Sequence, residues 1–285
     1  MGNFAGLRVL ALESRRAEEI ARLITSSGGA PVVAPSMREA PLESNKEALA
    51  FASDLRNGRF PVVIFLTGVG ARALARVVQS VYPLEEFIDA LRKSAVVARG
   101  PKPAAVLREW GVPIAVAVPE PNTWRELLRS LDEHSESAPV RGCRVAVQEY
   151  GAPNPELLAG LAERGAIVTR VPVYQWTLPE NTGPLRDAVA ALAREEIDVV
   201  LFTTSIQIEH LLQVAGEMGL VEPVRRALRK AVLASIGPTT SEALREHGLA
   251  PDLEPSHPKM GFLVKEAAAQ SSALLAAKRS RQPAP

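Results

Sequence analysis

An internal repeat is the feature that most constrains how this chain can fold. The segment VVIFLTGVGARAL from Val62 aligns without a gap with VVLFTTSIQIEHL from Val199. The same offset of 137 residues aligns VARGPKPAAVLREWG from Val97 with ASIGPTTSEALREHG from Ala234. The two beginnings agree as well, because RVLALESRRAEEIARLI at 8–24 resembles RVAVQEYGAPNPELLAGL at 144–161. Each half of the chain is therefore expected to contain the same supersecondary units.

Short β-rich runs alternate with segments of helical period in each half. The runs in the first half are Val9–Leu12, Val62–Leu66, Ala95–Ala98 and Ile114–Val118, and helical patterns such as AEEIARLI and AAVLREW lie between them. Such alternation predicts parallel sheets with helices on both faces. The predicted fold class is α/β, with two similar doubly wound parallel-sheet domains joined by a two-strand linker. Open sheets of this kind bind ligands beyond the carboxyl ends of their strands, so a cleft between the domains is the expected site.

Charge and apolar content limit the classes of partner. The 33 Lys and Arg nearly balance the 32 Asp and Glu, so no overall field attracts nucleic acid or an anionic membrane surface. Apolar runs such as PVVIFL are much shorter than the ~18 residues of a membrane span. The single cysteine excludes an intramolecular disulfide, and the first residues lack a secretory signal pattern. We expect a cytoplasmic, monomeric protein that binds neither nucleic acid nor membranes.

The second half carries motifs of a known family. VVLFTTS, followed by ASIGPTTSEALREHGLAPDLEPSHPKMGFLVKEA, is similar to the C-terminal pattern of uroporphyrinogen-III synthases. The opening RVLALESRRAEEIARLI and the loop VPVYQW also fit, so the resemblance extends over roughly residues 7–270. It implies an enzyme that cyclises the linear tetrapyrrole hydroxymethylbilane to uroporphyrinogen III, inverting the last pyrrole ring and losing water. It also implies that no cofactor and no metal take part, and the four histidines show no metal-ligand spacing.

The resemblance implies a discontinuous domain boundary. In this family the first β-α-β unit belongs to the same domain as the C-terminal half. Carried over, residues 1–35 and 175–270 form domain 1, which contains the Gly-Pro-Thr-Thr loop, and residues 36–174 form domain 2. The repeat alone favours a sequential cut near Pro139 instead. Residues 271–285, which end in AAKRSRQPAP without an apolar period, are expected to form a flexible tail.

The Gly-Pro-Thr-Thr loop is the main candidate for substrate binding. A substrate with eight carboxylates needs donors, and the N–H groups and dipole of a helix N-terminus attract anions. Gly237 would allow the backbone to approach a ligand. Thr239 or Thr240 would either cap the helix or donate a hydroxyl hydrogen bond. From the residues alone both roles remain open, and the family resemblance favours ligand contact.

Four further residues are candidates for substrate contacts. Thr67 and Thr204 follow predicted strands and fall where the family has a Ser or Thr that lines its cleft, with helix capping as the alternative. Arg99 and Lys102 would meet substrate carboxylates if they face the cleft, whereas surface Arg and Lys usually serve solvation. We therefore expect the site to combine backbone donors, hydroxyl groups and two cations.

Tyr174 is the candidate catalytic residue. It matches the cleft tyrosine of the family, a proposed proton donor to the departing hydroxyl. Phenols are protonated at neutral pH and suit that role. Without the resemblance, Tyr174 would be interpreted as an ordinary aromatic residue at a strand end.

Departures from the family pattern favour a second hypothesis. The usual FTSxNGV of the first half is FLTGVGA here, the Ser-Pro-Ser-Gly of the second half is TSIQ after Thr203, and the early Thr-Arg-Pro is Leu12-Glu13-Ser14. FLTGVGARAL with ARGPKP is similar to the synthase-like domains that some bacteria attach to a winged-helix DNA-binding region. The alternative function is therefore a non-catalytic, tetrapyrrole-sensing domain of a regulator.

A dinucleotide-binding oxidoreductase is a further alternative. Gly68, Gly70 and Ala73 fit the loose Gly-x-Gly-x-x-Ala pattern, after a strand and before a helix. However, the motif does not follow the first strand, the next strand ends in Arg99 instead of an acid, and the repeat copy TSIQIEH has no glycine. A periplasmic-type binding protein of two α/β lobes is disfavoured because the expected signal peptide is missing.

Overall fold

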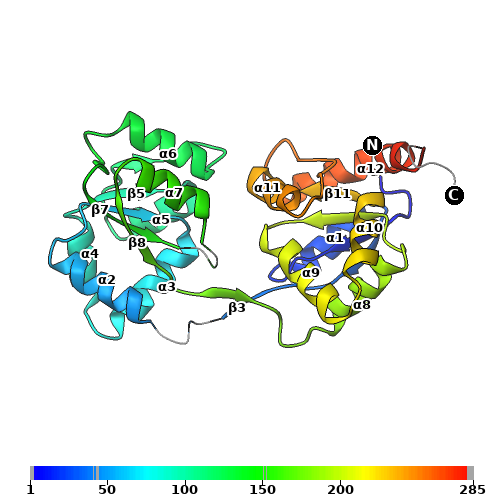
Figure 1. Cartoon of the computed structure of the whole chain (residues 1–285), viewed down its shortest axis with the longest axis horizontal. Helices are drawn as coiled ribbons and strands as arrows, with labels where there is room; N and C mark the ends of the chain where they lie inside the picture. Colours follow the sequence, from blue (N-terminus) through cyan, green and yellow to red (C-terminus); the bar gives the residue numbers. More distant parts are fainter. Residues whose placement is uncertain (1–2, 41, 43–44, 150, 152, 281–285) are drawn as a thin grey trace. The chain divides into compact units, whose positions relative to one another are not determined.

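The computed structural model describes residues 3–40, 42, 45–149, 151 and 153–280 (Figure 1). The chain divides into two compact units. Unit 1 contains Met1–Arg38 and Thr177–Pro285, and unit 2 contains Glu39–Trp176. Each unit has its own parallel sheet and its own hydrophobic clusters. The prediction of doubly wound parallel sheets is therefore confirmed.

Unit 1 is built on a four-stranded parallel sheet with the strand order β11-β10-β1-β2. Helices α8 to α11 pack on one face, and α1 and α12 pack on the other. Burial on both faces explains why β10 reads as the continuous apolar run VVLF. The elements are β1 (Arg8–Ala11), α1 (Ala17–Ser26), β2 (Ala30–Val33), α8 (Gly183–Ala193), β10 (Val199–Phe202), α9 (Ile206–Glu217), α10 (Val221–Lys230), β11 (Val232–Ser235), α11 (Pro238–Glu246) and α12 (Met260–Ser280).

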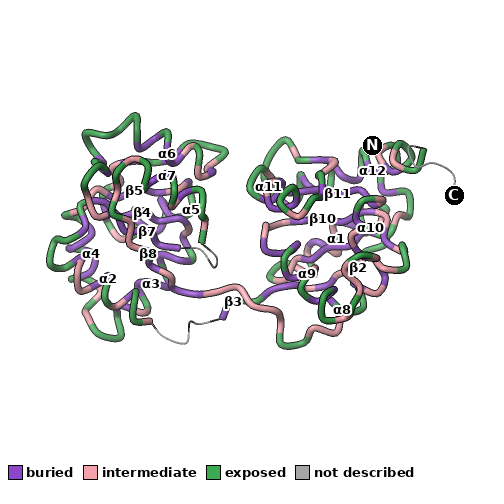
Figure 2. The backbone as a smooth tube through the Cα atoms, in the orientation of Figure 1, coloured by how far each residue is buried: buried purple, intermediate pink, exposed green. Residues whose placement is uncertain are grey.

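Unit 2 is built on a five-stranded parallel sheet with the order β6-β5-β4-β7-β8. Helices α2 to α5 cover one face, and α6 and α7 cover the other. Figure 2 shows the buried residues concentrated along the strands of each unit. The elements are α2 (Lys46–Arg56), β4 (Val62–Phe65), α3 (Gly68–Gln79), α4 (Leu84–Leu91), β5 (Ala95–Ala98), α5 (Pro101–Glu109), β6 (Val116–Ala117), α6 (Trp124–Glu133), β7 (Arg144–Gln148), α7 (Pro155–Glu163) and β8 (Ile167–Val171).

A two-stranded sheet contains both positions at which the chain passes from one unit to the other. It pairs β3 (Arg38–Ala40) with β9 (Gln175–Thr177). The limits of the units fall inside these strands, after Arg38 and after Trp176. Because β1 pairs with β10 and β4 pairs with β7, neither sheet is formed from one half of the chain alone.

The C-terminal helix corrects the expectation of a tail over residues 271–285. Residues 271–280 belong to α12, where Ser271 and Leu275 are buried. The helix packs against α1, and its buried face continues at helical spacing from Leu263 and Val264 through Ala267, Ala268 and Ser271 to Leu275. Residues 281–285 lie outside the described part of the chain. Among the described helices, none is both long enough and apolar enough to cross a membrane.

Candidate functional site

The Gly-Pro-Thr-Thr loop joins β11 to α11 at the carboxyl edge of the unit 1 sheet. Gly237 is the N-cap residue, and no side chain caps the helix. Ser241 N donates to Gly237 O at 3.0 Å, whereas the N–H groups of Thr239 and Thr240 have no acceptor among the described residues. Thr239 is exposed and Thr240 is buried. The loop thus presents two backbone donors at the positive end of the helix dipole, and neither threonine acts as the cap.

Nothing in the backbone requires a glycine at position 237. Its φ of 168° is extended, and a Cβ there would lie 3.6 Å from Pro258 Cβ, an ordinary contact. Gly100, its repeat counterpart, differs because its φ is 92° and a Cβ would lie 2.7 Å from Asn122 Oδ1. The fold therefore explains Gly100 but not Gly237.

Gln207 and Glu13 organise the turn that follows β10. Gln207 is fully buried, and its Oε1 accepts from Thr203 N at 2.7 Å and from Thr204 N at 3.3 Å. Gln207 Nε2 donates to Thr203 Oγ1 at 2.9 Å, and that hydroxyl donates to Glu13 Oε2 at 2.6 Å. The backbone donor of Thr204, a predicted substrate-binding residue, is therefore already satisfied within the protein.

Thr67 is a helix cap. Its Oγ1 accepts from Gly70 N at 3.0 Å at the start of α3, and its own N–H donates to Gln148 Oε1 at 3.4 Å. A Cβ on Gly70 would overlap the side-chain amide of Gln148, and a Cβ on Gly68 would lie 2.7 Å from Lys102 O. Close packing accounts for both glycines, which removes the main support for a dinucleotide loop.

Arg99 and Lys102 follow β5, next to the turn that contains Thr67. Arg99 N donates to Phe65 O at 3.0 Å, which places the ends of β4 and β5 side by side. Lys102 is exposed in the first turn of α5. The structure thus brings Thr67, Arg99 and Lys102 to one edge of the unit 2 sheet.

Tyr174 lies between β8 and β9 and is only 6% exposed. Its ring packs edge-on against Trp176, with 5.5 Å between the ring centroids. It belongs to the hydrophobic cluster beneath α2 to α5, and its phenol oxygen is shielded from solvent. Tyr174 follows the carboxyl end of β8 by three residues, with its side chain buried in the cluster.

The candidates of unit 1 lie on neighbouring strands. Ile236 N donates to Phe202 O at 2.9 Å, which places the Gly237 loop beside the turn of Thr203 and Thr204. With Glu13 after β1, three adjacent strand ends carry polar groups at one edge. Sequence reasoning missed the roles of Glu13 and Gln207, because their partners are distant in the sequence. A signal existed for the acid, since Glu149 follows β7 as Glu13 follows β1, at an offset of 136.

The counterpart Glu149 is a structural ion pair. It is 4% exposed, and Arg170 donates to its two carboxylate oxygens at 2.6 and 3.0 Å. The hydrogen bond to Glu149 raises the pKa of Arg170 above its usual value. Glu13 instead accepts from a hydroxyl and two backbone N–H groups. The partners of Glu13 in these hydrogen bonds are therefore neutral, whereas the partner of Glu149 is a cation.

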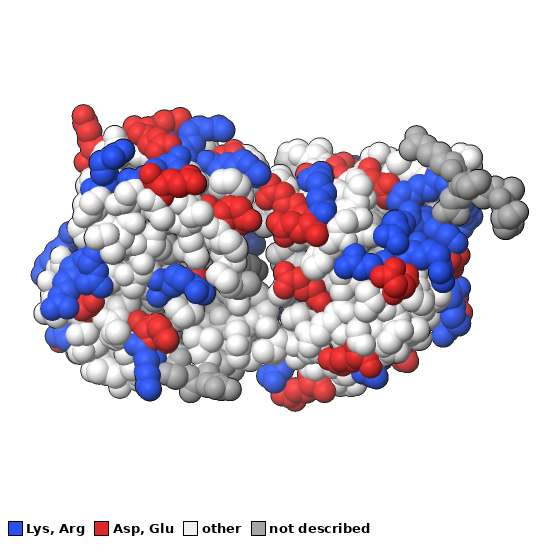
Figure 3. Space-filling view, in the orientation of Figure 1, with Lys and Arg blue, Asp and Glu red and all other residues white. Residues whose placement is uncertain are grey.

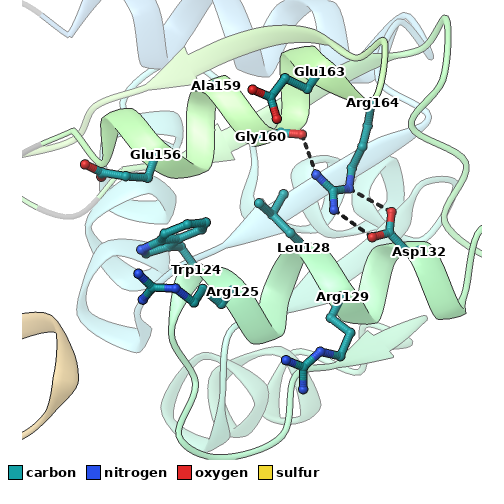
Figure 4. A pocket seen from close by; sticks show the side chains of 10 residues that line it. All are labelled: Trp124, Arg125, Leu128, Arg129, Asp132, Glu156, Ala159, Gly160, Glu163 and Arg164. Carbon is teal, nitrogen blue, oxygen red and sulfur yellow. Dashed lines mark hydrogen bonds and ion pairs between the residues drawn. The ribbon is translucent and has the colours of Figure 1, made fainter.

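A shallow groove lies elsewhere in unit 2, between α6 and α7. Figure 4 shows Arg164 pairing with Asp132 and donating to Gly160 O. The hydrogen bond from Arg164 lowers the pKa of Asp132. The groove contains none of the predicted site residues. Its lining residues are Trp124, Arg125, Leu128, Arg129, Asp132, Glu156, Ala159, Gly160, Glu163 and Arg164.

The described residues contain no cluster of three or more His, Cys, Asp or Glu arranged to hold a metal ion.

Comparison with known proteins identifies the family. The family model described as uroporphyrinogen-III synthase HemD matches residues 18–265. The uncharacterized protein YjjA of Bacillus subtilis strain 168 is 34% identical over 271 residues, which are 92% of this chain and 95% of that protein.

Two further relatives carry the family name. A protein of Methanothermobacter thermautotrophicus, named a uroporphyrinogen-III synthase with the assignment marked as provisional, is 31% identical over 82% of this chain and 87% of its own length. The crystal structure of a mutant uroporphyrinogen III synthase from Thermus thermophilus matches with a TM-score of 0.71 and 27% identity, covering 93% of this chain and 99% of that chain. The family model and the 31% identical relative show that the chain belongs to the uroporphyrinogen-III synthase family.

Proposed function

We propose that this protein is a uroporphyrinogen-III synthase, which closes hydroxymethylbilane to uroporphyrinogen III without a cofactor. One observation carries the proposal beyond family membership: the two N–H groups of Thr239 and Thr240, which have no acceptor among the described residues. A helix N-terminus with open donors suits a carboxylate. The substrate has carboxylates on every ring, so such donors can hold it without a strongly basic pocket.

The other candidate residues supply further contacts in this proposal. Arg99 and Lys102 in unit 2 meet carboxylates, while the hydroxyls of Thr67 and Thr204 donate to the substrate. Thr67 Oγ1 accepts from Gly70 N and keeps its own proton for a ligand. In unit 1, Gly237 leaves room for the substrate to approach the backbone.

The chemistry requires little covalent participation from the protein. The hydroxyl leaves the terminal carbon with the bonding electrons, takes up a proton and departs as water. The remaining azafulvenium cation is attacked by the substituted α-carbon of the last ring, which forms a spiro intermediate. The bond from that carbon to the preceding methylene bridge then breaks, and the bridge re-bonds to the unsubstituted α-carbon of the same ring. That carbon loses its proton, which restores the aromatic rings with the last ring inverted. Holding the chain so that this carbon lies nearest is the main task of the protein. We assign the proton transfer to Tyr174, which must become accessible to the substrate for this step.

Isomer analysis tests the proposal. Purified protein is supplied with freshly made hydroxymethylbilane, and the III isomer is separated from the I isomer that forms spontaneously. We expect isomer III in excess, and slower but measurable turnover by Tyr174→Phe, because geometry contributes more than a single proton donor. Production of only isomer I by the native protein, together with measurable tetrapyrrole binding, would reject the enzyme and support the sensing domain.

A further inference from the structure

Glu13 is held at the centre of the carboxyl edge of unit 1. It follows β1, which with β10 forms the middle of the sheet. Its Oε1 accepts from Arg15 N at 3.1 Å and from Arg16 N at 3.2 Å, and its Oε2 accepts from the Thr203 hydroxyl at 2.6 Å. Three donors from two segments therefore fix the carboxylate in one orientation.

The direction of these hydrogen bonds is set by the main chain. Gln207 Oε1 accepts from the N–H groups of Thr203 and Thr204, so Gln207 Nε2 must face the Thr203 hydroxyl oxygen as a donor. That oxygen can then send its own proton only toward Glu13. Gln207 is fully buried, whereas Thr203 and Glu13 are partly exposed. The carboxylate is preorganised before any ligand arrives.

The position of this acid relative to the Gly237 loop suggests what it contacts. β1, β10 and β11 are neighbours in the sheet, so the strands that lead to Glu13 and to the Gly237 loop lie about 10 Å apart, two strand spacings. A fixed carboxylate repels substrate carboxylates and attracts cations and N–H donors. The N–H donors of the Gly237 loop, at the same edge of the sheet, attract carboxylates instead. This edge therefore has one part that favours anions, the Gly237 loop, and one part that favours cations, Glu13.

We propose that Glu13 is a catalytic carboxylate that accepts a hydrogen bond from a pyrrole N–H of the activated ring and stabilises the azafulvenium cation. This inference rests on the proposed function. When the carbon–oxygen bond breaks, the positive charge spreads onto the pyrrole nitrogen, and its N–H becomes a stronger donor to Glu13. The proton stays on nitrogen, and the cation is consumed when the new carbon–carbon bond forms. The interaction is stronger in the transition state than with the neutral substrate, so it acts on kcat.

Glu13→Gln tests the role because it removes the charge but keeps an oxygen for Arg15 N and Arg16 N. We expect kcat to fall about 100-fold, the magnitude typical of losing one preorganised electrostatic group. KM should change little, and the melting temperature shows whether the variant stays folded after the Thr203 hydroxyl loses its acceptor. Glu18→Gln, on the exposed side of α1, is the matched control and should keep the native kcat. Native kcat in a folded Glu13→Gln variant overturns the proposal.

Two further measurements complete the test. If Glu13→Gln does not fold, Thr203→Val retains the charge but frees the carboxylate from its hydroxyl partner, and kcat should fall without a matching rise in KM. A protonated dipyrrin, a delocalised pyrrolic cation, should bind the native protein about tenfold more tightly than Glu13→Gln, while uroporphyrinogen III binds both equally. Equal dipyrrin binding overturns the role of Glu13 even if the native protein forms only isomer I, the outcome that rejects the proposed function.

Discussion

Gly100 and Gly237 occupy equivalent positions of the repeat, yet the fold requires only one of them. Gly100→Ala should destabilise unit 2 by about 1–3 kcal/mol, because its φ of 92° with ψ of −174° is a conformation that other residues rarely adopt. Gly237→Ala should change stability by less than about 0.5 kcal/mol. Thermal unfolding of the two variants followed by circular dichroism measures the difference.

The same pair separates a structural glycine from a functional one. Gly237→Leu should fold but bind uroporphyrinogen III at least about tenfold more weakly, a loss of about 1.4 kcal/mol, because its side chain occupies the approach to the Thr239 and Thr240 donors. Equal destabilisation by both alanine variants would contradict the structural argument. Native binding by Gly237→Leu would show that the substrate does not approach this loop.

Glu196 provides a pH-dependent contribution to stability far from the site. Arg194 Nε lies 2.6 Å and Arg8 Nη1 3.1 Å from its carboxylate, and these hydrogen bonds lower the pKa of Glu196 from 4.5 to about 2.

Figure 3 shows Lys and Arg side chains gathered around α10 and the end of α12. Lys230 there pairs with Glu195. The surface is therefore a network of exposed ion pairs rather than an uncompensated basic patch.

The lowered pKa determines the sign of the pH effect. The ionised Glu196 carboxylate stabilises the folded protein fully above pH 4.5. This stabilisation is lost as the pH falls toward 2, because protonation of Glu196 breaks its ion pairs in the folded state. Glu196→Gln should therefore unfold more easily than the native protein at pH 7, and the difference should vanish near pH 2. NMR titration of the carboxyl carbon gives the pKa directly, and added salt should weaken the effect. A titration midpoint near the ordinary value of 4.5 in the native protein would exclude the interaction.

At the level of elements, the sequence predicted strands better than side-chain networks. The run expected at Val62–Leu66 forms β4 at Val62–Phe65, because a strand buried on both faces reads as an uninterrupted apolar run. The part of α12 beyond residue 270 was missed because only Ser271 and Leu275 are buried there, which is too few for a clear apolar period. The buried positions from Met260 to Leu275 nevertheless follow one helical spacing.

The candidate site could be predicted only in part, for a related reason. The loop after β11 could be located because Gly-Pro-Thr-Thr is local and repeats the turn after β5. The hydroxyl of Thr203 meets Glu13 across 190 residues of sequence, so no local pattern reports that contact. Thr67 was assigned to the substrate, yet its oxygen caps α3. The cap uses only the oxygen of the Thr67 hydroxyl as an acceptor, so the hydroxyl proton is still available to a ligand.

At the scale of the whole molecule, the pairing of strands decides which pieces of the chain can fold. β4 pairs with both β5 and β7, and the two hydrophobic clusters of unit 2 consist of residues within Glu39–Trp176. In unit 1, β1 pairs with β10, although the two strands are far apart in the sequence. The repeat would suggest a cut near Pro139, but that cut separates β4 from β7 and β1 from β10.

These pairings lead to a prediction about fragments of the chain. Residues 39–176 expressed alone should give a compact monomer with a single cooperative unfolding transition, because this segment contains a complete sheet with helices on both faces. Residues 1–139 should not fold cooperatively, since their two partial sheets leave apolar edges of β4 and β1 uncovered. Circular dichroism and denaturant titration of both fragments measure the outcome. Cooperative folding of 1–139 together with a disordered 39–176 would show that the repeat, rather than the strand pairing, defines the folding units.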